Sequence, residues 1–260
     1  MSRSCAIIKN ECGDIRPQLG GLHYVRCNEM KHEIIAQCCS KRLDLENAKL
    51  SDEYYYKSLS LCVIDAVFSI GIRYAITRNV VRNFCNKLLI ERLREDGSPY
   101  PPIEHQFSIE ALLNLYDQFS INEITDNFFC SRNRTSSKNG ILKSEAVSRF
   151  CTELKEFGVN YFQDLPLIIG NDRFENSIKK IPGQGSGLST SYFYMLAGEE
   201  NVIKADRMII RFIESCIHLV VTTTEASQLI MEAHEILREE FPSLTPRILD
   251  HEIWKYQRRI

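Results

Sequence analysis

The sequence predicts an all-α protein, and three observations lead to this prediction. Apolar residues recur every three or four positions along most of the 260-residue chain, which is the spacing of a helix with one buried face. Glycine and proline fall mainly between these segments, and proline inside a helix costs about 3 kcal/mol relative to alanine. The alternation of Val, Ile and Thr that is typical of strands is scarce, apart from the ambiguous run Leu219–Thr224.

The first half of the chain predicts an irregular start followed by helices. Residues up to about Arg26 have no clear period and include RPQLGG, which is typical of a loop. Helical spacing then covers about 29–49, 52–70, 77–95, 108–116 and 122–129. The clearest loop is Asp96–Pro102, which contains one glycine and three prolines.

The second half begins with the polar, basic segment Ser131–Ser144 and continues with further helices. These are expected at about 141–158, 172–180, 188–197, 206–220, 224–240 and 245–258. In the last of them we interpret Asp250 and Trp254 as core residues.

Composition limits the compartment and the partners. The net charge of -2 argues against a generally basic coat for nucleic acid, although a local basic face remains compatible with it. The ten cysteines include no CxxC pair and lie in apolar patterns, so we expect reduced thiols in a cytosolic or nuclear compartment. Leu59–Ile72 is too short for a membrane span and carries Asp65, and no secretory signal is recognised. The histidines lack ligand spacing, so no transition-metal site is expected.

The segment Ile181–Gly187, IPGQGSG, interrupts two helices with a proline and three glycines. Gly183 and Gly185 can adopt positive φ and fold the backbone into a tight hairpin. The amides around Gly185 and Ser186 then lie at the start of the next helix, where the helix dipole favours an anion such as a phosphate. A plain turn that joins two packed helices is the alternative.

Asp206 lies 21 positions after Gly185, directly before an amphipathic helix. An aspartate there should stay ionised, because the helix dipole favours its anion. An ionised carboxylate stabilises the positive charge that develops on a sugar when an N-glycosidic bond breaks. A simple helix cap is the alternative role, and the two roles are compatible.

These two segments together resemble the helix-hairpin-helix (HhH-GPD) DNA glycosylase superfamily. Its members carry an L-P-G-hydrophobic-G hairpin, followed downstream by V-D-T-H-V-x-R at the catalytic aspartate. The positions that match are Ile181, Pro182, Gly183 and Gly185 in the hairpin, and Ala205, Asp206, Ile209 and Arg211 in the aspartate segment. Arg207 and Met208 replace the usual Thr-His.

Weaker matches extend the resemblance from about Leu59 to Trp254. Gly140–Val147 is similar to a family helix start, and Leu59–Phe84 is similar to the family's early helix pair. The resemblance implies two helical lobes with a DNA cleft between them over residues 51–260. Residues 1–50 are then an N-terminal extension with one helix, which we expect to pack on the C-terminal lobe.

The resemblance also implies roles for individual residues. Asp206 would be catalytic, and the target base would be flipped out of the duplex into a pocket. Tyr192 could stack on that base, and Arg73 or Tyr74 could fill the gap left in the stack. The DNA backbone would be bound by the hairpin and by the basic loop before the 141–158 helix. The residues assigned to it are Gly183, Gln184, Gly185, Ser186, Gly187, Arg132, Arg134, Lys138 and Lys143.

Two departures from the family pattern narrow the expected activity. Members that also cleave the DNA backbone carry a nucleophilic lysine where this chain has Gly187, so we expect a monofunctional enzyme that uses water. Lys204 is the alternative amine. The four closely spaced cysteines of the iron–sulfur branch are missing after Asp206, so no cluster is expected. No other cofactor is expected, although a monovalent cation at the hairpin is compatible with the resemblance.

The sequence therefore predicts a monomeric DNA glycosylase that acts on double-stranded DNA, without a membrane partner, in the nucleoid-containing cytoplasm or the nucleus. The alternatives are a non-catalytic DNA-binding protein of the same fold and a helical interaction protein without DNA affinity. The identity of the excised base stays open, including whether it is damage or a natural modification.

Overall fold

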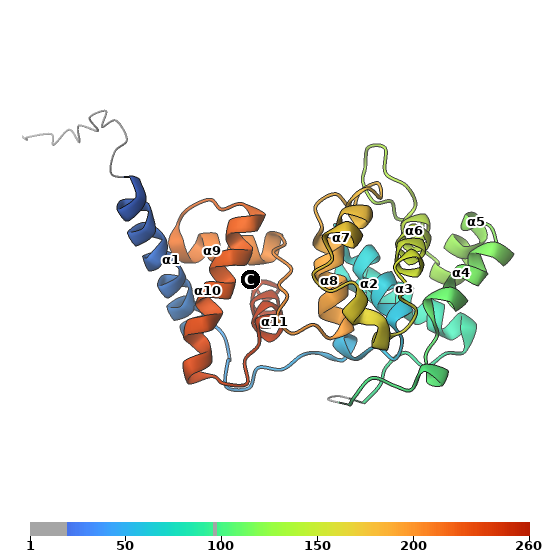
Figure 1. The fold of residues 1–260 in the computed structure, drawn as a ribbon, viewed down its shortest axis with the longest axis horizontal. Coiled ribbons are helices and arrows are strands. Elements are labelled where there is room, and N and C mark those ends of the chain that lie inside the picture. The colour runs from blue at the N-terminus through green and yellow to red at the C-terminus, as the bar shows by residue number, and fades with distance from the viewer. Residues whose placement is uncertain (1–19, 96–97) are drawn as a thin grey trace, which may run out of the picture.

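The computed structural model describes residues 20–95 and 98–260, and helices dominate this part of the chain. Its helices gather in two lobes that lie side by side (Figure 1). We call residues 50–202 the large lobe, and residues 20–49 together with 203–260 the small lobe. The prediction of an all-α protein is confirmed for the described residues, which form isolated bridges but no sheet.

The large lobe is built around α2 (Leu59–Ser69), which is buried along almost its whole length. It contacts α3 (Tyr74–Leu88), α6 (Lys143–Glu156) and α8 (Leu188–Ala197). A helix surrounded by protein on every side needs no polar face, which explains the apolar run from Leu59. The other elements are η1 (Asp52–Tyr55), η2 (Ile103–His105), α4 (Ile109–Gln118), α5 (Ile121–Ile124), η3 (Thr125–Phe129), η4 (Phe162–Leu167) and α7 (Asp172–Lys179).

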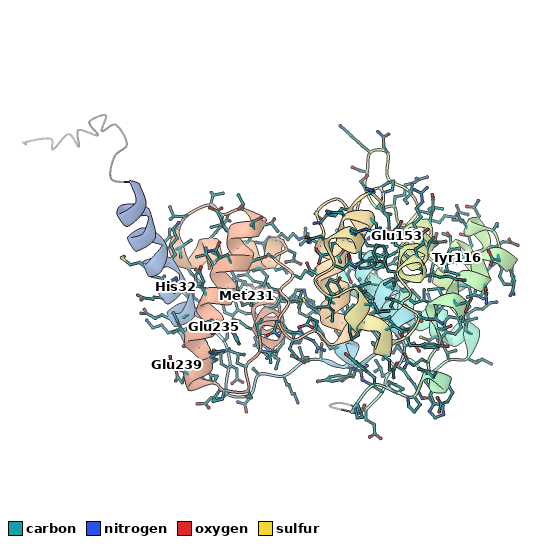
Figure 2. The ribbon with its side chains drawn as sticks, in the orientation of Figure 1. His32, Tyr116, Glu153, Met231, Glu235 and Glu239 are labelled. Atoms are coloured by element: carbon teal, nitrogen blue, oxygen red, sulfur yellow. The ribbon has the colours of Figure 1, made fainter. Side chains whose placement is uncertain are left out.

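A polar contact joins two outer helices of the large lobe. The hydroxyl of Tyr116 on α4 donates a hydrogen bond to the carbonyl oxygen of Ser144 on α6 at 2.6 Å (Figure 2). This bond uses a carbonyl near the start of α6 and orients α4 beside it.

The small lobe combines the N-terminal helix with the last three helices. These are α1 (Gly20–Arg42), α9 (Arg207–Ile217), α10 (Thr223–Glu240) and α11 (Pro246–Gln257). Ile35 and Cys39 of α1 are fully buried in the same core as Phe212 and Ile230. His32 of α1 lies 3.4 Å from the carboxylate of Glu232 on α10, and Figure 2 shows its side chain beside that helix. The helix of the N-terminal segment thus packs on the C-terminal helices.

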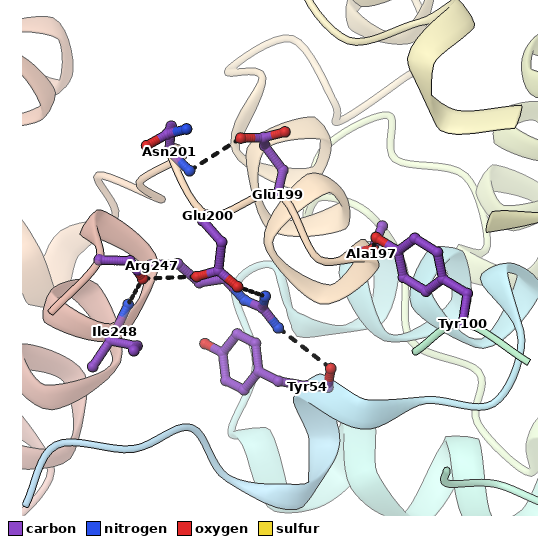
Figure 3. A network of polar contacts seen from close by, with 9 residues as sticks. Tyr54, Tyr100, Ala197, Glu199, Glu200, Asn201, Arg247 and Ile248 are labelled. Atoms are coloured by element: carbon purple, nitrogen blue, oxygen red, sulfur yellow. Dashed lines mark hydrogen bonds and ion pairs between the residues drawn. The ribbon is translucent and has the colours of Figure 1, made fainter. Parts of the chain in front are cut away.

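Arg247, near the start of α11, links the two lobes (Figure 3). Its buried guanidinium forms an ion pair with Glu200 at 2.8 Å and donates a hydrogen bond to the carbonyl oxygen of Tyr54 at 3.4 Å. The guanidinium carbon also lies 5.2 Å from the centroid of the Tyr54 ring. Thr245 donates a further hydrogen bond to Glu200 at 2.8 Å. Because a buried charge without its partner is costly, this clamp holds α11 against the large lobe.

Side-chain caps determine where several helices begin. Ser120 with Glu123 at α5, and Thr222 with Glu225 at α10, form reciprocal capping boxes. A cap contributes about 1 kcal/mol, and its residue types are readable from sequence. The caps place Leu219–Val221 in a connection before α10, so the ambiguous run is not a strand.

The main differences from the expected helices lie near the N-terminus. The helix expected at 29–49 covers Gly20–Arg42, so it begins within the stretch up to Arg26 that was expected to be irregular. Residues 43–49 are not helical, and Leu43 and Leu45 are buried. The segment expected at 52–70 is divided into η1 and α2. Tyr56 between them pairs with Leu93 in an isolated bridge, so a long-range contact replaces the local helical one.

Seven of the ten cysteines have described side chains, and all seven are free thiols. The free cysteines are Cys38, Cys39, Cys62, Cys85, Cys130, Cys151 and Cys216, and five of them are buried. The side chains of the other three cysteines lie outside the described part of the chain. No helix among the described residues is long and apolar enough to cross a membrane.

Candidate functional site

A pocket with a volume of about 570 Å³ lies between the two lobes. The large lobe contributes residues of η1, of the connection between α2 and α3, and of α8. The small lobe contributes the segment before α9, the first turn of α9 and one face of α11. Four residues that the sequence singled out line this pocket together: Asp206, Arg73, Tyr74 and Tyr192.

Asp206 is the N-cap residue of α9. Its Oδ1 accepts a hydrogen bond from the amide of Met208 at 2.7 Å, and its side chain is 21% exposed. The cap role is therefore confirmed, and the same carboxylate borders the pocket. The carboxylate thus lies at the positive end of the α9 dipole.

Lys204 brings a positive charge into the pocket. Its Nζ lies 3.8 Å from Oδ2 of Asp206 and 3.8 Å from the centroid of the Tyr192 ring, and its side chain is 12% exposed. A carboxylate and an aromatic face both attract a cation. The ammonium is thus held between Asp206 and Tyr192.

Asp250 and His251 bring two buried titratable groups of α11 to the same pocket. Oδ2 of Asp250 accepts a hydrogen bond from the backbone amide of Lys204 at 2.9 Å. Burial, and then the negative charge of Asp206, raise the pKa of Asp250 well above its usual range. Burial, and then the charges of Lys255 and Arg247, lower the pKa of His251 to about 4. The imidazole of His251 is therefore neutral at pH 7.

Aromatic side chains from both lobes form a continuous surface in the pocket. Tyr54 lies 6.4 Å from Tyr192 and 5.1 Å from His251, measured between ring centroids and edge to face in both cases. His251 stacks on Trp254 at 5.7 Å, and Trp254 meets Tyr74 edge to face at 5.7 Å. Such a surface suits a planar, partly apolar ligand.

The orientation of Tyr74 is fixed by a hydrogen bond from its hydroxyl to a buried carboxyl group. Asp65 of α2 accepts hydrogen bonds from the hydroxyls of Tyr56 at 2.7 Å, Ser69 at 2.6 Å and Tyr74 at 3.0 Å. Burial raises the pKa of Asp65, and these three hydroxyls lower it in part. The network holds the Tyr74 ring beside Trp254.

The segment Ile181–Gly187 forms two consecutive turns between α7 and α8. The amide of Gln184 donates to the carbonyl oxygen of Ile181 at 2.9 Å, and that of Gly187 donates to Gln184 at 3.0 Å. Gly183 and Gly187 have φ of 84° and 74°, whereas Gly185 is not in the positive region, contrary to expectation. The second turn uses Gly187, directly before α8, for the reversal instead.

The polar groups of the hairpin divide into exposed and buried ones. In the described structure the amides of Gly185 and Ser186 donate no hydrogen bond, and both residues are exposed. Gln184 is 1% exposed, and neither polar atom of its side chain has a partner. The prediction that Gln184 contacts DNA is therefore wrong for this conformation, because the residue packs inward.

The basic loop lies against the hairpin. Thr135 occupies the space beside Gly183, so a Cβ placed on that glycine would lie 2.4 Å from the Cβ of Thr135. Arg132 forms an exposed ion pair with Asp126 at 2.6 Å, and Arg134 donates a hydrogen bond to the carbonyl oxygen of Gly140. Lys138 is also exposed. The loop therefore contacts the hairpin through Thr135, and the assignment of both to the DNA backbone stays a prediction.

Lys143 does not belong to that surface. It is 1% exposed, and its Nζ donates to the carbonyl oxygens of Phe68 at 2.8 Å and Ile70 at 2.6 Å. The prediction of a phosphate contact by Lys143 is wrong, because the ammonium satisfies the C-terminal carbonyls of α2 instead. Lys143 thereby holds the connection between α2 and α3, which borders the pocket.

The described residues contain no group of three or more His, Cys, Asp or Glu side chains that could hold a metal ion. The possible monovalent cation at the hairpin stays a prediction.

Comparison with known proteins gives a family for the chain. Residues 33–258 match the model of a family described as "Domain of unknown function (DUF8548)". The chain belongs to this family. No curated protein and no solved structure matches the chain. The DUF8548 match begins within α1 and ends after α11, so it includes both lobes and every residue that lines the pocket.

Within the DUF8548 region, sequence reasoning missed several pocket residues. Tyr54 and His251 were not singled out, Lys204 was considered only as an alternative amine, and Asp250 and Trp254 were assigned to the core. Asp250 and Trp254 are one helical turn apart on α11, which was a signal that they share a face. Nothing in the local sequence indicates that this face meets α8 and η1 across a pocket.

Proposed function

We propose that this protein is a monofunctional DNA glycosylase of the helix-hairpin-helix kind. It would hydrolyse the N-glycosidic bond of a damaged or modified base that is flipped out of double-stranded DNA. The observation that carries the proposal is the place of Asp206, a helix-capping carboxylate in an aromatic pocket between two lobes. The hairpin before α8 supports it, because Leu188 and Tyr192 of that helix line the same pocket.

Cleavage of the N-glycosidic bond requires a fixed negative charge near the sugar. When the bond between C1′ and the base breaks, positive charge develops on the sugar ring. The carboxylate of Asp206, held by the Met208 amide, stabilises that charge without having to reorganise. Water then adds to C1′, and the products are an abasic site and the free base.

The pocket has the size and lining that a flipped base requires. Its volume of about 570 Å³ lies within the range of small-molecule sites. Tyr74 and Trp254 are partly exposed and offer ring surface to a planar base, whereas Tyr54 and Tyr192 are buried in the pocket wall. Asp206 lies at the same pocket, so a base stacked there would have its sugar near this carboxylate.

The surroundings of the pocket supply positive charge for the DNA backbone. Arg73, Arg207 and Arg258 line the pocket and are exposed. The exposed amides of Gly185 and Ser186, at the start of α8, suit one phosphate. A local basic rim of this kind is compatible with a net charge of -2.

Two observations support water rather than a lysine as the nucleophile. The hairpin position of the family's lysine is Gly187, the N-cap residue of α8. Lys204 lies between the Asp206 carboxylate and the Tyr192 ring, both of which attract an ammonium ion, and an ammonium has no lone pair for attack on C1′. We therefore expect no borohydride-trapped adduct with abasic DNA.

The proposal is tested with duplexes that each carry one altered base, assayed for strand cleavage after alkali. Asp206→Asn should lower base release by about 100-fold or more, because the charge that stabilises the transition state is lost. Duplex affinity should be largely unchanged. Asp117→Asn, which removes an exposed carboxylate of α4, is the matched control and should keep full activity.

The outcomes separate the proposal from its alternatives. Salt-dependent duplex binding without release of any base would favour a non-catalytic DNA-binding protein of the same architecture. No affinity for any duplex at low salt would overturn both DNA functions. Full turnover by Asp206→Asn would overturn the role of that residue.

The proposed activity also implies an oligomeric state and a compartment for the protein. One copy contains both lobes and the whole pocket, so we propose that a monomer acts on double-stranded DNA without a cofactor. Its compartment would be one that holds DNA, either a nucleoid-containing cytoplasm or a nucleus.

A further inference from the structure

The interlobe pocket holds two carboxyl groups in unlike surroundings. Asp206 and Asp250 both line it, one at the start of α9 and the other within α11. The side chain of Asp206 is 21% exposed, whereas Asp250 is 5% exposed. Two titratable groups that share a site but differ in environment are how a protein separates an acid from an ionised carboxylate.

The contacts of the two carboxyl groups differ. Asp206 accepts the Met208 amide at the positive end of the α9 dipole and lies near the Lys204 ammonium. Asp250 has one hydrogen bond, from the Lys204 amide to Oδ2, and is buried in the wall of the pocket. Desolvation and the charge of Asp206 both favour the neutral acid at Asp250.

The other titratable groups that face Asp250 do not reverse the rise in its pKa. Tyr54 of η1 is held neutral by burial, which raises its pKa well above the usual range, and His251 of α11 is neutral at pH 7. Arg247 of α11 is paired with Glu200. The ammonium of Lys204 opposes the rise in the pKa of Asp250, but burial and Asp206 outweigh it.

Asp250 is also in the right place to meet a stacked base. Asp250 and Trp254 are four residues apart on α11, so their side chains share one face of the helix, and both line the pocket. His251 stacks on Trp254 and meets Tyr54 edge to face. A base that packs against this aromatic surface has the carboxyl group of Asp250 beside it.

We infer that Asp250 is the general acid that protonates the departing base, and that the substrate is therefore a base without a positive charge. This inference rests on the proposed glycosylase function and names the substrate class for it. A neutral base is a poor leaving group until a proton reaches one of its ring nitrogens or exocyclic oxygens. A cationic base, such as 7-methylguanine, leaves as a neutral molecule and needs no acid.

The step balances without a further reactant. The bond between C1′ and the base nitrogen breaks, its electron pair goes to the base, and the base takes the proton of Asp250. Water adds through its oxygen to C1′ and releases one proton. That proton restores the acid form of Asp250 directly or through solvent, so one water is consumed for each base released.

The test compares neutral and cationic bases in otherwise identical duplexes. The probes are duplexes with uracil, hypoxanthine or 8-oxoguanine, and one with 7-methylguanine, in single-turnover assays with the full chain. Asp250→Asn should lower release of a neutral base by about 100-fold or more and leave 7-methylguanine release unchanged. The rate for the neutral base in the unaltered protein should fall at alkaline pH, and this fall should be absent in Asp250→Asn.

Control variants keep the test decisive. Glu252→Gln removes a buried carboxyl group of α11 that pairs with Lys255 and does not line the pocket, so it should leave both rates unchanged. Asp206→Asn should lower both rates. Circular dichroism and duplex affinity show whether Asp250→Asn is folded. If it is not, the unaltered protein still decides, because an alkaline fall in neutral-base release that 7-methylguanine release does not share is expected only if an acid protonates the neutral base.

The results distinguish the inference from the function on which it rests. Release of no base from any duplex by the unaltered protein would overturn the proposed function. Release of a neutral base at the same rate by Asp250→Asn would overturn only the acid role. An equal loss on neutral and cationic bases would also overturn it, as would release of 7-methylguanine alone by the unaltered protein.

Discussion

The hairpin between α7 and α8 allows a sharp test of how its glycines act. Gly183 has a φ of 84°, and a Cβ there would lie 2.4 Å from Thr135 Cβ and 2.6 Å from Thr135 Oγ1. Gly183→Ala therefore meets both backbone strain and a steric clash. Gly170 has a φ of 70° with nothing within 4 Å of such a Cβ, so Gly170→Ala meets the strain alone. Gly185→Ala meets neither, because the nearest atom is 3.7 Å away.

The three substitutions should differ in the free energy of unfolding. Alanine in the left-handed region costs about 1–2 kcal/mol. The lower entropy of the unfolded chain returns about 0.4–1 kcal/mol of this. We therefore expect Gly170→Ala to lose about 0.5–1 kcal/mol. Overpacking adds about 1–3 kcal/mol at Gly183, for a total of about 1.5–4 kcal/mol. Gly185→Ala should stay within about 0.5 kcal/mol of the original protein.

Urea titrations followed by helical circular dichroism measure these differences. Adding Thr135→Gly to Gly183→Ala should remove the clash and restore the stability lost to it, while the backbone strain remains. A double-mutant cycle separates these two contributions. A loss for Gly183→Ala no larger than that for Gly170→Ala would refute the argument that Thr135 and the hairpin are in close contact.

Three further predictions concern buried and exposed charges. His251 is neutral in the fold with a pKa of about 4, whereas the unfolded chain binds its proton below about pH 6.5. The free energy of unfolding should thus fall by up to about 3 kcal/mol from pH 6.5 to pH 4. His251→Phe should remove this part of the fall in urea titrations, and an unchanged pH dependence would contradict the assignment. In duplex binding by fluorescence anisotropy, Lys138→Ala should reduce the slope of log affinity against log salt by about 1. Lys143→Met should leave that slope unchanged but lower stability by about 1–3 kcal/mol, because two carbonyls lose their donor. A reduced slope for Lys143→Met would show that Lys143 contacts the DNA backbone after all.

The parts of the fold that were predicted best depend on local signals. The helix expected at 188–197 has these bounds in α8, because Gly187 and Gly198 both adopt left-handed φ at its ends. The cap by Asp206 follows from one side chain and the amide two residues later. Such features need only neighbouring residues, so a sequence pattern is enough to predict them.

The parts that were predicted wrongly depend on what lies across the fold. Lys143 looked like a phosphate ligand in a basic loop, yet its ammonium binds carbonyls at the end of α2. Gln184 looked like a hairpin contact and is buried. A charge or an amide has the same sequence pattern in both situations, and only the packing of distant segments decides between them.

For this protein, the sequence alone determined the all-α class, the hairpin at Ile181–Gly187 and the position of Asp206 at a helix start. Helix period, glycine conformation and capping act over a few residues, which is why they can be read locally. The tertiary structure alone decided that Asp206, Lys204, Asp250 and the aromatic surface share one pocket between the lobes. Burial and charge proximity arise from residues far apart in the chain, and at Asp250 they raise the pKa of the carboxyl group well above its usual range.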